Sequence, residues 1–277
     1  MNLGPDQIDR DVLVEACAEG SLELAKLLST AVGLTAADVC ASGLAALVMP
    51  CMRGHLEVVQ WLCGEFRLTA DDVRANDLAP LAMASSCGQL EVVRWLCGAF
   101  ALSGWDVRAS NFRVLAVACG SGNVALVAWL KDEFGLTRDD IRRSNGAVLR
   151  AACERGHLPV AQWLKDAFAL GPADLCAGRN CAIRAAYRNS HLDVATWLEA
   201  AAAVNPADIR ARGPHRDDSL MRHAIARGDG AVAQALCSRY AFTRAELHAA
   251  VASWAHSPEI ALRAARTARA LRICEQI

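Results

Sequence analysis

The sequence predicts an all-α fold, a solenoid in which similar helical hairpins are stacked along almost the whole chain. Three observations predict it: a segment that recurs every 34 residues, apolar residues at helical spacing within each copy, and a glycine between the two helical segments of most copies. We expect one solenoid over residues 1–277, with repeats at about 4–37, 38–71, 72–105, 106–139, 140–173, 174–207 and 208–245 and a C-terminal cap at 246–277.

The repeated segment occurs in six copies, each of which starts 34 residues after the one before it. The copies read GSLELAKLL (20–28), GHLEVVQWL (54–62), GQLEVVRWL (88–96), GNVALVAWL (122–130), GHLPVAQWL (156–164) and SHLDVATWL (190–198). A seventh copy, GDGAVAQAL (228–236), follows after 38 residues, which indicates four inserted residues near 213–216. A fixed period of this length is typical of solenoids, in which each repeat is one supersecondary unit.

Each copy predicts two helices joined by a tight turn. In the second helix, Leu56, Val58, Val59, Trp61 and Leu62 fall on one face, and the same columns recur in the other copies. We therefore expect the tryptophan of each copy to pack in the core: Trp61, Trp95, Trp129, Trp163 and Trp197. The glycine follows the first helix, where we expect it to adopt the left-handed conformation that ends a helix without a Cβ clash.

A third element follows the second helix, in the segments FRLTADDV (66–73), FALSGWDV (100–107), FGLTRDDI (134–141) and FALGPADL (168–175). A hydroxyl residue followed three positions later by an acid is the pattern of a capping box, and the pairs here are Thr69 with Asp72, Ser103 with Asp106 and Thr137 with Asp140. In the next two repeats, Gly171-Pro172 and Asn205-Pro206 place proline at a first helical position. We expect a short helical turn here instead of a β-hairpin.

The block G-H-L-x-V-x-x-W-L, preceded by an alanine-rich helix as in LRAACERGHLPVAQWL (149–164), closely resembles the ankyrin repeat. The T-P-L-H signature of that family is reduced to forms such as Ala79-Pro80-Leu81-Ala82, as in the divergent, Trp-Leu-rich ankyrin repeats of amoebae and large DNA viruses. The resemblance implies a non-enzymatic module that binds another protein and needs no cofactor.

Composition and charge restrict the class of protein further. Hydrophobic residues make up 54% and charged residues 21% of the chain, so it can bury a large core and is not disordered. The net charge is −1, but residues 1–140 carry 10 Lys and Arg against 18 Asp and Glu, whereas residues 141–277 carry 19 against 12. A uniformly basic nucleic-acid binder is therefore disfavoured, although the C-terminal half is basic.

The 12 cysteines occur without a recognisable signal peptide or an apolar stretch long enough to cross a membrane. We therefore expect free thiols and a cytoplasmic or nuclear protein without membrane insertion. Cys17, Cys51, Cys119 and Cys153 share one repeat position, which indicates buried packing residues. Cys176 and Cys181 form only C-x₄-C, and His215-Arg216-Asp217 lies in the insertion, so we expect neither a metal site nor a catalytic site.

The partner-binding residues follow from the resemblance, because in ankyrin proteins the residues just before the turn glycine and on the outer side of the first helix line a groove. These positions include Met52, Arg53, Glu154, Arg155, Arg188 and Arg227. Arg150, Arg184 and Arg222 recur six positions before the turn residue and predict a column of guanidinium groups, which suits carboxylates or phosphates. We also expect Leu44, Leu78 and Phe112 to make a more apolar groove in repeats two to four.

Our functional hypothesis is that repeats five to seven bind an acidic segment of a partner protein, with the chain itself a monomer. Two alternatives stay open. The arginines could serve only as solvating charge, since the chain has 26 Arg and 3 Lys, which suggests a compositional bias. The basic C-terminal half could instead bind a nucleic acid or an anionic surface, with a steep salt dependence.

Overall fold

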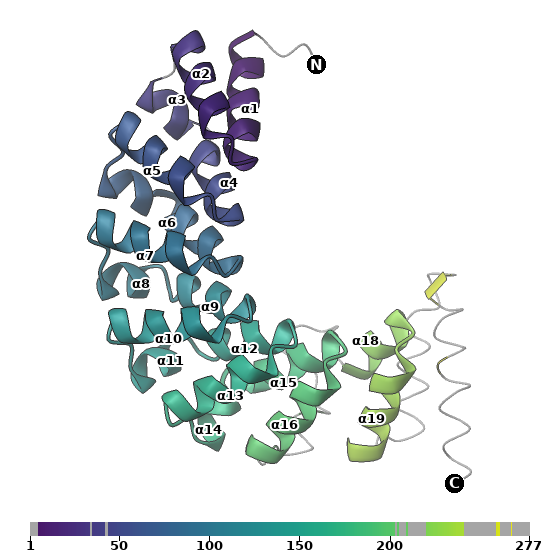
Figure 1. Ribbon diagram of the computed structural model, residues 1–277. Coiled ribbons are helices and arrows are strands. Elements are labelled where there is room, and N and C mark those ends of the chain that lie inside the picture. Colours follow the sequence, from purple (N-terminus) through teal and green to yellow (C-terminus); the bar gives the residue numbers. More distant parts are fainter. Residues whose placement is uncertain are drawn as a thin grey trace. The chain divides into compact units, whose positions relative to one another are not determined.

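The computed structural model describes residues 5–33, 35–41, 44–202, 204, 209, 220–240, 259–260 and 267 of the chain. Every regular element within these ranges is an α-helix (Figure 1). The chain divides into two compact units, Met1–Asp140 and Ile141–Ile277, which are described separately below. The insertion near 213–216, Asn205-Pro206 and nearly all of the expected cap at 246–277 lie outside the described residues.

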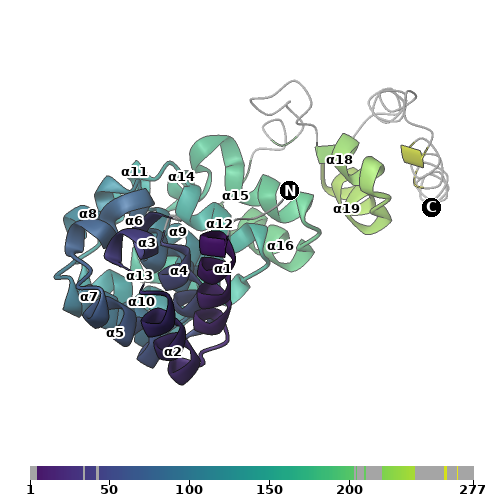
Figure 2. The same cartoon turned by 90° about the horizontal axis from the view of Figure 1, so that it is seen from above.

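Unit 1 is a stack of helical hairpins. Its helices are α1 (Pro5–Ala18), α2 (Leu22–Val32), α3 (Ala36–Ala41), α4 (Ala45–Arg53), α5 (Leu56–Glu65), α6 (Ala70–Ser86), α7 (Leu90–Ala99), α8 (Gly104–Ala109), α9 (Arg113–Gly120), α10 (Val124–Glu133) and, at its end, α11 (Arg138–Arg143). The first helices α1, α4 and α9 and the later part of α6 form one layer, and the second helices α2, α5, α7 and α10 form another (Figure 1). Figure 2, which looks along this stack, separates the same two layers.

Unit 2 repeats the same hairpin. Its helices are α12 (Ala147–Glu154), α13 (Leu158–Ala167), α14 (Pro172–Leu175), α15 (Ala177–Arg188), α16 (Leu192–Ala202), α18 (Leu220–Arg227) and α19 (Gly230–Tyr240). The first helices α12, α15 and α18 contact one another in that order, since α15 lies against both of the others. Each of these three helices packs against the second helix that follows it.

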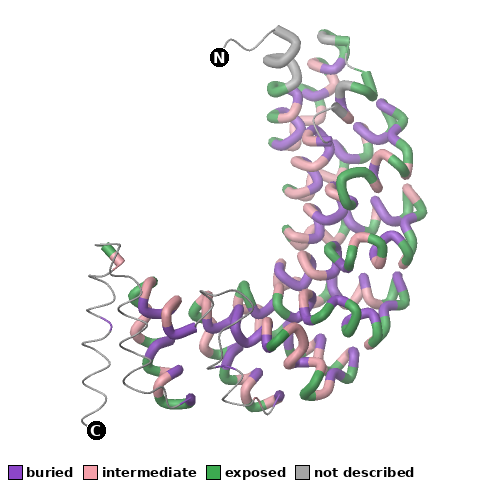
Figure 3. Tube along the Cα trace, turned by 180° about the vertical axis from the view of Figure 1, so that it is seen from behind, coloured by how far each residue is buried: buried purple, intermediate pink, exposed green. Residues whose placement is uncertain are grey.

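The core lies between the two layers of helices, where the repeat columns place apolar residues. Val58, Val59 and Leu62 of α5 are buried, and so are their counterparts in the second helices that follow (Figure 3). Cys17, Cys51, Cys119 and Cys153 are fully buried, which confirms the prediction that they are packing residues. Burial raises the pKa of Cys17 to about 12, so this thiol stays protonated and unreactive.

The repeated tryptophans differ from their prediction, because all five are only half-buried. Trp129 meets Phe134 edge-on, with the ring centroids 6.2 Å apart, and Arg94 from the preceding repeat lies 5.7 Å from the centre of the same ring. The pairs Trp61–Phe66, Trp95–Phe100 and Trp163–Phe168 repeat the edge-on contact. The indole is too large to enter the space between the layers completely, so each tryptophan covers the edge of the core.

The turn between the two helices of a repeat has the predicted left-handed residue. This residue is a glycine with positive φ in six repeats, at Gly20, Gly54, Gly88, Gly122, Gly156 and Gly228, and Ser190 takes the same conformation in the remaining one. At Gly156 glycine is needed for a second reason, since a Cβ there would lie 2.5 Å from Nδ1 of His191 in the next repeat. The histidine after the turn therefore packs on the glycine of the preceding repeat.

Between residues 35 and 175 the third element of the repeat is a short helical segment, as predicted, and three of these segments begin with the predicted acid cap. The carboxylate of Asp72 accepts a hydrogen bond from the backbone N–H of Thr69 at 2.7 Å, and the corresponding bond from Ser103 to Asp106 is also 2.7 Å long. The same bond from Thr137 to Asp140 is 2.9 Å long. In unit 2 the short helix α14 begins at Pro172. Backbone groups that a β-hairpin would pair are satisfied here by side-chain caps.

Candidate functional site

The first helices of unit 2 carry a concentration of positive charge. Helices α12, α15 and α18 carry six arginines, one histidine and a single carboxylate, Glu154. We define the arginine layer as the following cationic residues of these helices and of the residue that caps α12: Arg150, Arg155, Arg184, Arg188, Arg222, His223 and Arg227. Since α15 lies against both α12 and α18, the repeat brings these cations together from three hairpins.

The predicted column of Arg150, Arg184 and Arg222 is exposed only in part. Arg150 is exposed and Arg222 is half-buried, whereas only 3% of Arg184 is exposed to solvent. Arg184 lies within α15, between α12 and α18, and its Nη1 donates a hydrogen bond to the backbone carbonyl of Ile209 at 3.4 Å. The expectation that Arg184 presents its guanidinium group to solvent is therefore wrong. Arg155 and Arg227 are exposed, and Arg188 is half-buried.

Hydrogen bonds hold several members of the arginine layer in place. Arg227 Nη1 donates to the backbone carbonyl of Arg188 at 3.0 Å, so α18 supplies a donor to the C-terminal end of α15. On α12, Arg150 Nη1 forms an ion pair of 2.6 Å with Oε2 of Glu154. A donor at a helix C-terminus satisfies carbonyls that have no partner within the helix, and a positive charge is favourable there.

The cations of the layer lie close enough to affect one another. Burial lowers the pKa of Arg184. Burial also lowers the pKa of Arg188, the charges of Arg184 and Arg150 lower it further, and Glu154 raises it. The pKa of His223 is lowered by burial, then by the charges of Arg188 and Arg227, and is raised by a hydrogen bond with the Arg188 backbone. Positive charges are thus concentrated at a partly desolvated surface, which favours the binding of anions.

The predicted site residues of unit 1 do not form an exposed apolar surface. Leu78 and Phe112 are each only 3% exposed, and Leu44 is buried as well, so the expected apolar groove is wrong for these side chains. All three residues have positive φ, at 62° for Leu44, 58° for Leu78 and 59° for Phe112. Because this left-handed backbone interrupts the right-handed helix, the helical register that predicted an outward direction does not extend to them.

Two predicted residues of unit 1 remain accessible. Met52 is half-buried and Arg53 is exposed at the C-terminal end of α4. The backbone carbonyl of Met52 accepts a hydrogen bond from Nε2 of Gln89 at 3.1 Å. Gln89 directly follows the turn glycine of the next repeat, so that repeat binds the C-terminal end of α4. Asn123 binds the carbonyl of Gly88 at 3.0 Å in the same way.

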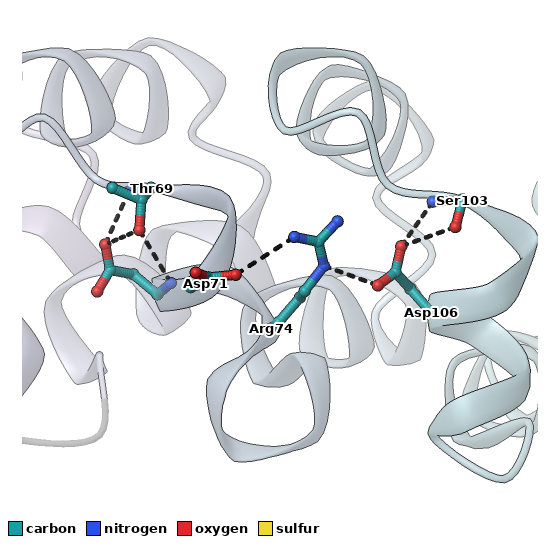
Figure 4. A network of polar contacts seen from close by, with 6 residues as sticks. Thr69, Asp71, Arg74, Ser103 and Asp106 are labelled. Atoms are coloured by element: carbon teal, nitrogen blue, oxygen red, sulfur yellow. Dashed lines mark hydrogen bonds and ion pairs between the residues drawn. The ribbon is translucent and has the colours of Figure 1, made fainter.

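A series of ion pairs between successive short helices was not predicted. Arg74 Nε lies 2.7 Å from Oδ1 of Asp106, the capping carboxylate of the next repeat, and the same guanidinium group also reaches Asp71 on its own helix (Figure 4). The corresponding Arg108–Asp140 and Arg142–Asp174 distances are 2.9 Å and 2.8 Å. The signal in the sequence is Asp-x-Arg at Asp72, Asp106 and Asp140 with a 34-residue period.

Asp106 and Asp140 have lowered pKa values because each carboxylate binds both an arginine of the preceding repeat and its own helix cap. Burial raises the pKa of Asp106, but hydrogen bonds from Arg74 and Ser103 outweigh it, and the net shift is downward. The hydrogen bond from Arg108, assisted by Thr137, lowers the pKa of Asp140 to about 2. The series connects repeats to one another, and its acids are already engaged, so it is a structural feature and not a binding site.

The cysteine pair in unit 2 does not have the arrangement of a metal site. Cys176 Sγ lies 3.9 Å from the carbonyl of Ala202, and Cys181 Sγ lies 3.6 Å from the carbonyl of Gly146. Within the described ranges, no group of three His, Cys, Asp or Glu side chains is placed to hold a metal ion. His215-Arg216-Asp217 lies outside them.

The comparison with protein families agrees with the repeat and the hairpin geometry. Residues 13–111 match the family described as ankyrin repeats, in three copies. This part of the chain consists of ankyrin repeats. The fold is accordingly the all-α ankyrin type, with short helices in place of most β-hairpins. Ankyrin repeats generally mediate protein–protein interactions and are typically not enzymes.

Two further findings concern similarity to other curated proteins and membrane-spanning helices. The search of curated proteins gave no match to this chain. Among the helices of the described part, none has both the length and the apolar character needed to cross a membrane.

Proposed function

We propose that the chain is a non-enzymatic ankyrin-repeat module that binds an acidic segment of a partner protein on the arginine layer of repeats five to seven. The observation that carries this proposal is the imbalance of charge on α12, α15 and α18, where six arginines accompany one carboxylate. Surface helices that serve only solubility normally mix both signs of charge.

Guanidinium groups suit this task because their planar donors bind carboxylates in pairs. Arg150, Arg155 and Arg227 are exposed, so their donors are accessible to a partner. Arg227 is already fixed by its bond to the Arg188 carbonyl, which reduces the entropy that binding would remove. The buried charge of Arg184 adds positive potential from below, where water screens it less.

The experiment that tests this function is affinity capture from a nuclease-treated lysate of the source organism. The variant reverses the three exposed arginines, as Arg150→Glu, Arg155→Glu and Arg227→Glu. The matched control reverses all three lysines of the chain, as Lys26→Glu, Lys131→Glu and Lys165→Glu, which makes the same change in net charge at residues that are not part of the layer. Far-ultraviolet circular dichroism checks that both proteins remain helical.

We expect wild type and the lysine control to retain the same protein, and the arginine variant to lose it. Limited proteolysis of the captured complex should leave a bound fragment that contains a run of Asp and Glu. Capture that survives the arginine reversal, or recovery of nucleic acid alone from an untreated lysate, would contradict the proposed function.

A further inference from the structure

Glu154 is the only carboxylate on the three helices that carry the arginine layer. Its repeat position is taken by Arg188 in the next repeat and by Ala226 in the one after it. Sequence reasoning placed Glu154 among the residues that contact a partner, but its charge is opposite to that of its surroundings.

The structure shows where this carboxylate binds. Oε2 of Glu154 lies 2.6 Å from Nη1 of Arg150, and both side chains are at the surface, with 47% and 45% of their areas exposed. Glu154 also raises the pKa of Arg188 on α15, in opposition to Arg184 and Arg150. One carboxylate therefore interacts with guanidinium groups of two adjacent first helices.

Stabilisation of helix α12 does not account for this ion pair. Glu154 is the last residue of α12, at the negative end of the helix dipole, where an acid is unfavourable and a base is favourable. The pair also has the less favourable order, with the base at position i and the acid at position i+4. Both charges would stabilise the helix better if they were exchanged.

We propose that Glu154 is a built-in competitor, a carboxylate of the chain itself that occupies the arginine layer and that an acidic partner segment must displace. This inference rests on the proposed function and identifies the ligand class as carboxylate, because a carboxylate already occupies the surface. Exposed ion pairs are weak and exchange readily, so Glu154 limits the affinity without blocking the site. A partner with several acids replaces it at Arg150 and gains Arg188 and Arg227 as well.

The test is a titration of the whole chain with a fluorescein-labelled peptide of eight glutamates, followed by fluorescence anisotropy. The variant is Glu154→Gln, which keeps the size of the side chain and removes its charge. The matched control is Asp166→Asn, because Asp166 is an exposed acid of unit 2 that pairs with its neighbour Lys165 on α13, away from the layer. Both variants change the net charge by one.

Glu154→Gln should tighten peptide binding by about threefold to tenfold, and Asp166→Asn by less than about twofold. The gain should vanish in the background of Arg150→Gln, since the competitor acts through that arginine. Equal or weaker binding by Glu154→Gln, with wild-type binding that still depends on Arg150, Arg155 and Arg227, would overturn the competitor and leave the proposed function intact. Failure of both wild type and Glu154→Gln to bind the peptide would contradict both proposals.

Discussion

At the scale of single residues, Arg74 forms two ion pairs that we expect to contribute differently to the stability of the fold, because one acidic partner is buried and the other is exposed. Its guanidinium group reaches two carboxylates, Asp71 on its own helix at 3.4 Å and Asp106 of the next repeat at 2.7 Å (Figure 4). The side chain of Asp71 is 95% exposed, whereas Asp106 is buried. Asp106 also caps the following short helix through the backbone N–H of Ser103, so it connects two repeats.

Removing these two acids should therefore have very different effects on stability. Asp106→Ala should lower the free energy of unfolding by about 2–3 kcal/mol, because it removes a helix cap and leaves one partner of a half-buried pair. Asp71→Ala should lower it by less than about 0.5 kcal/mol, as expected for an exposed pair. Urea denaturation measures both variants. Similar losses in the two variants would show that the contact between repeats adds nothing.

His223 makes stability depend on pH. Its pKa is lowered by burial and by Arg188 and Arg227, so the folded chain favours the neutral ring. The stabilisation is present above the ordinary pKa of about 6.5 and is lost as pH falls through the lower folded value. We expect the difference in melting temperature between pH 7.5 and pH 5 to be smaller for His223→Gln than for wild type. An unchanged difference would show that His223 does not contribute to this loss.

At the scale of the elements, six repeats place a glycine with positive φ at the turn between their two helices. Gly156 has φ of 77°, and a Cβ there would meet the ring of His191. Gly64, near the end of α5, has open space around it and an ordinary helical setting. The two glycines therefore differ in whether their backbone and their surroundings would accept a Cβ atom.

Substitution by alanine should separate these roles. Gly156→Ala should cost about 1–3 kcal/mol through the left-handed backbone and the contact with His191. Gly64→Ala should stabilise the chain by up to about 1 kcal/mol, because alanine favours the helix. Thermal unfolding followed by circular dichroism gives both values. Stabilisation by Gly156→Ala would show that the turn does not need glycine.

The elements themselves were largely predictable, because a repeat multiplies each local signal. The period gave the hairpins, and the turn glycines and capping boxes gave the helix ends. The burial of the Leu78 and Phe112 side chains was not predictable. It depends on left-handed backbone within α6 and before α9, and none of the residues that adopt it there is a glycine that would have indicated it. The half-burial of the tryptophans and the burial of Arg184 also depend on how closely neighbouring helices pack, which the sequence does not state.

The sequence predicted which helices form the candidate site, but not the burial or the contacts of its side chains. The spacing of Arg150, Arg184 and Arg222 identified the helices that carry the positive charge. It could not show that Arg184 lies beneath the surface, that Arg227 is fixed to the end of α15, or that Glu154 binds Arg150. The ion pairs between short helices were not predicted, because the Asp and the Arg of one short helix do not bind each other. Asp106 binds Arg74 of the preceding repeat, whereas Arg108 binds Asp140 of the following repeat.

At the scale of the whole molecule, the two units have opposite charges. Residues 1–140 have a balance of −8 and residues 141–277 a balance of +7, and the change of sign coincides with the boundary between the compact units. A net charge near zero thus conceals a strongly cationic unit. An acidic segment should associate with unit 2 at a rate that falls as salt is added, because dissolved ions screen exposed charges.

The measurement that tests the central claim most directly is the titration of wild type and of the Arg150→Glu, Arg155→Glu, Arg227→Glu variant with the eight-glutamate peptide at low and high salt. We predict saturable binding to one site on wild type at 50 mM NaCl, weakening by at least about tenfold at 300 mM, and no binding by the variant. Equal binding by the two proteins, or none by wild type, would contradict the claim that the arginine layer is the binding surface.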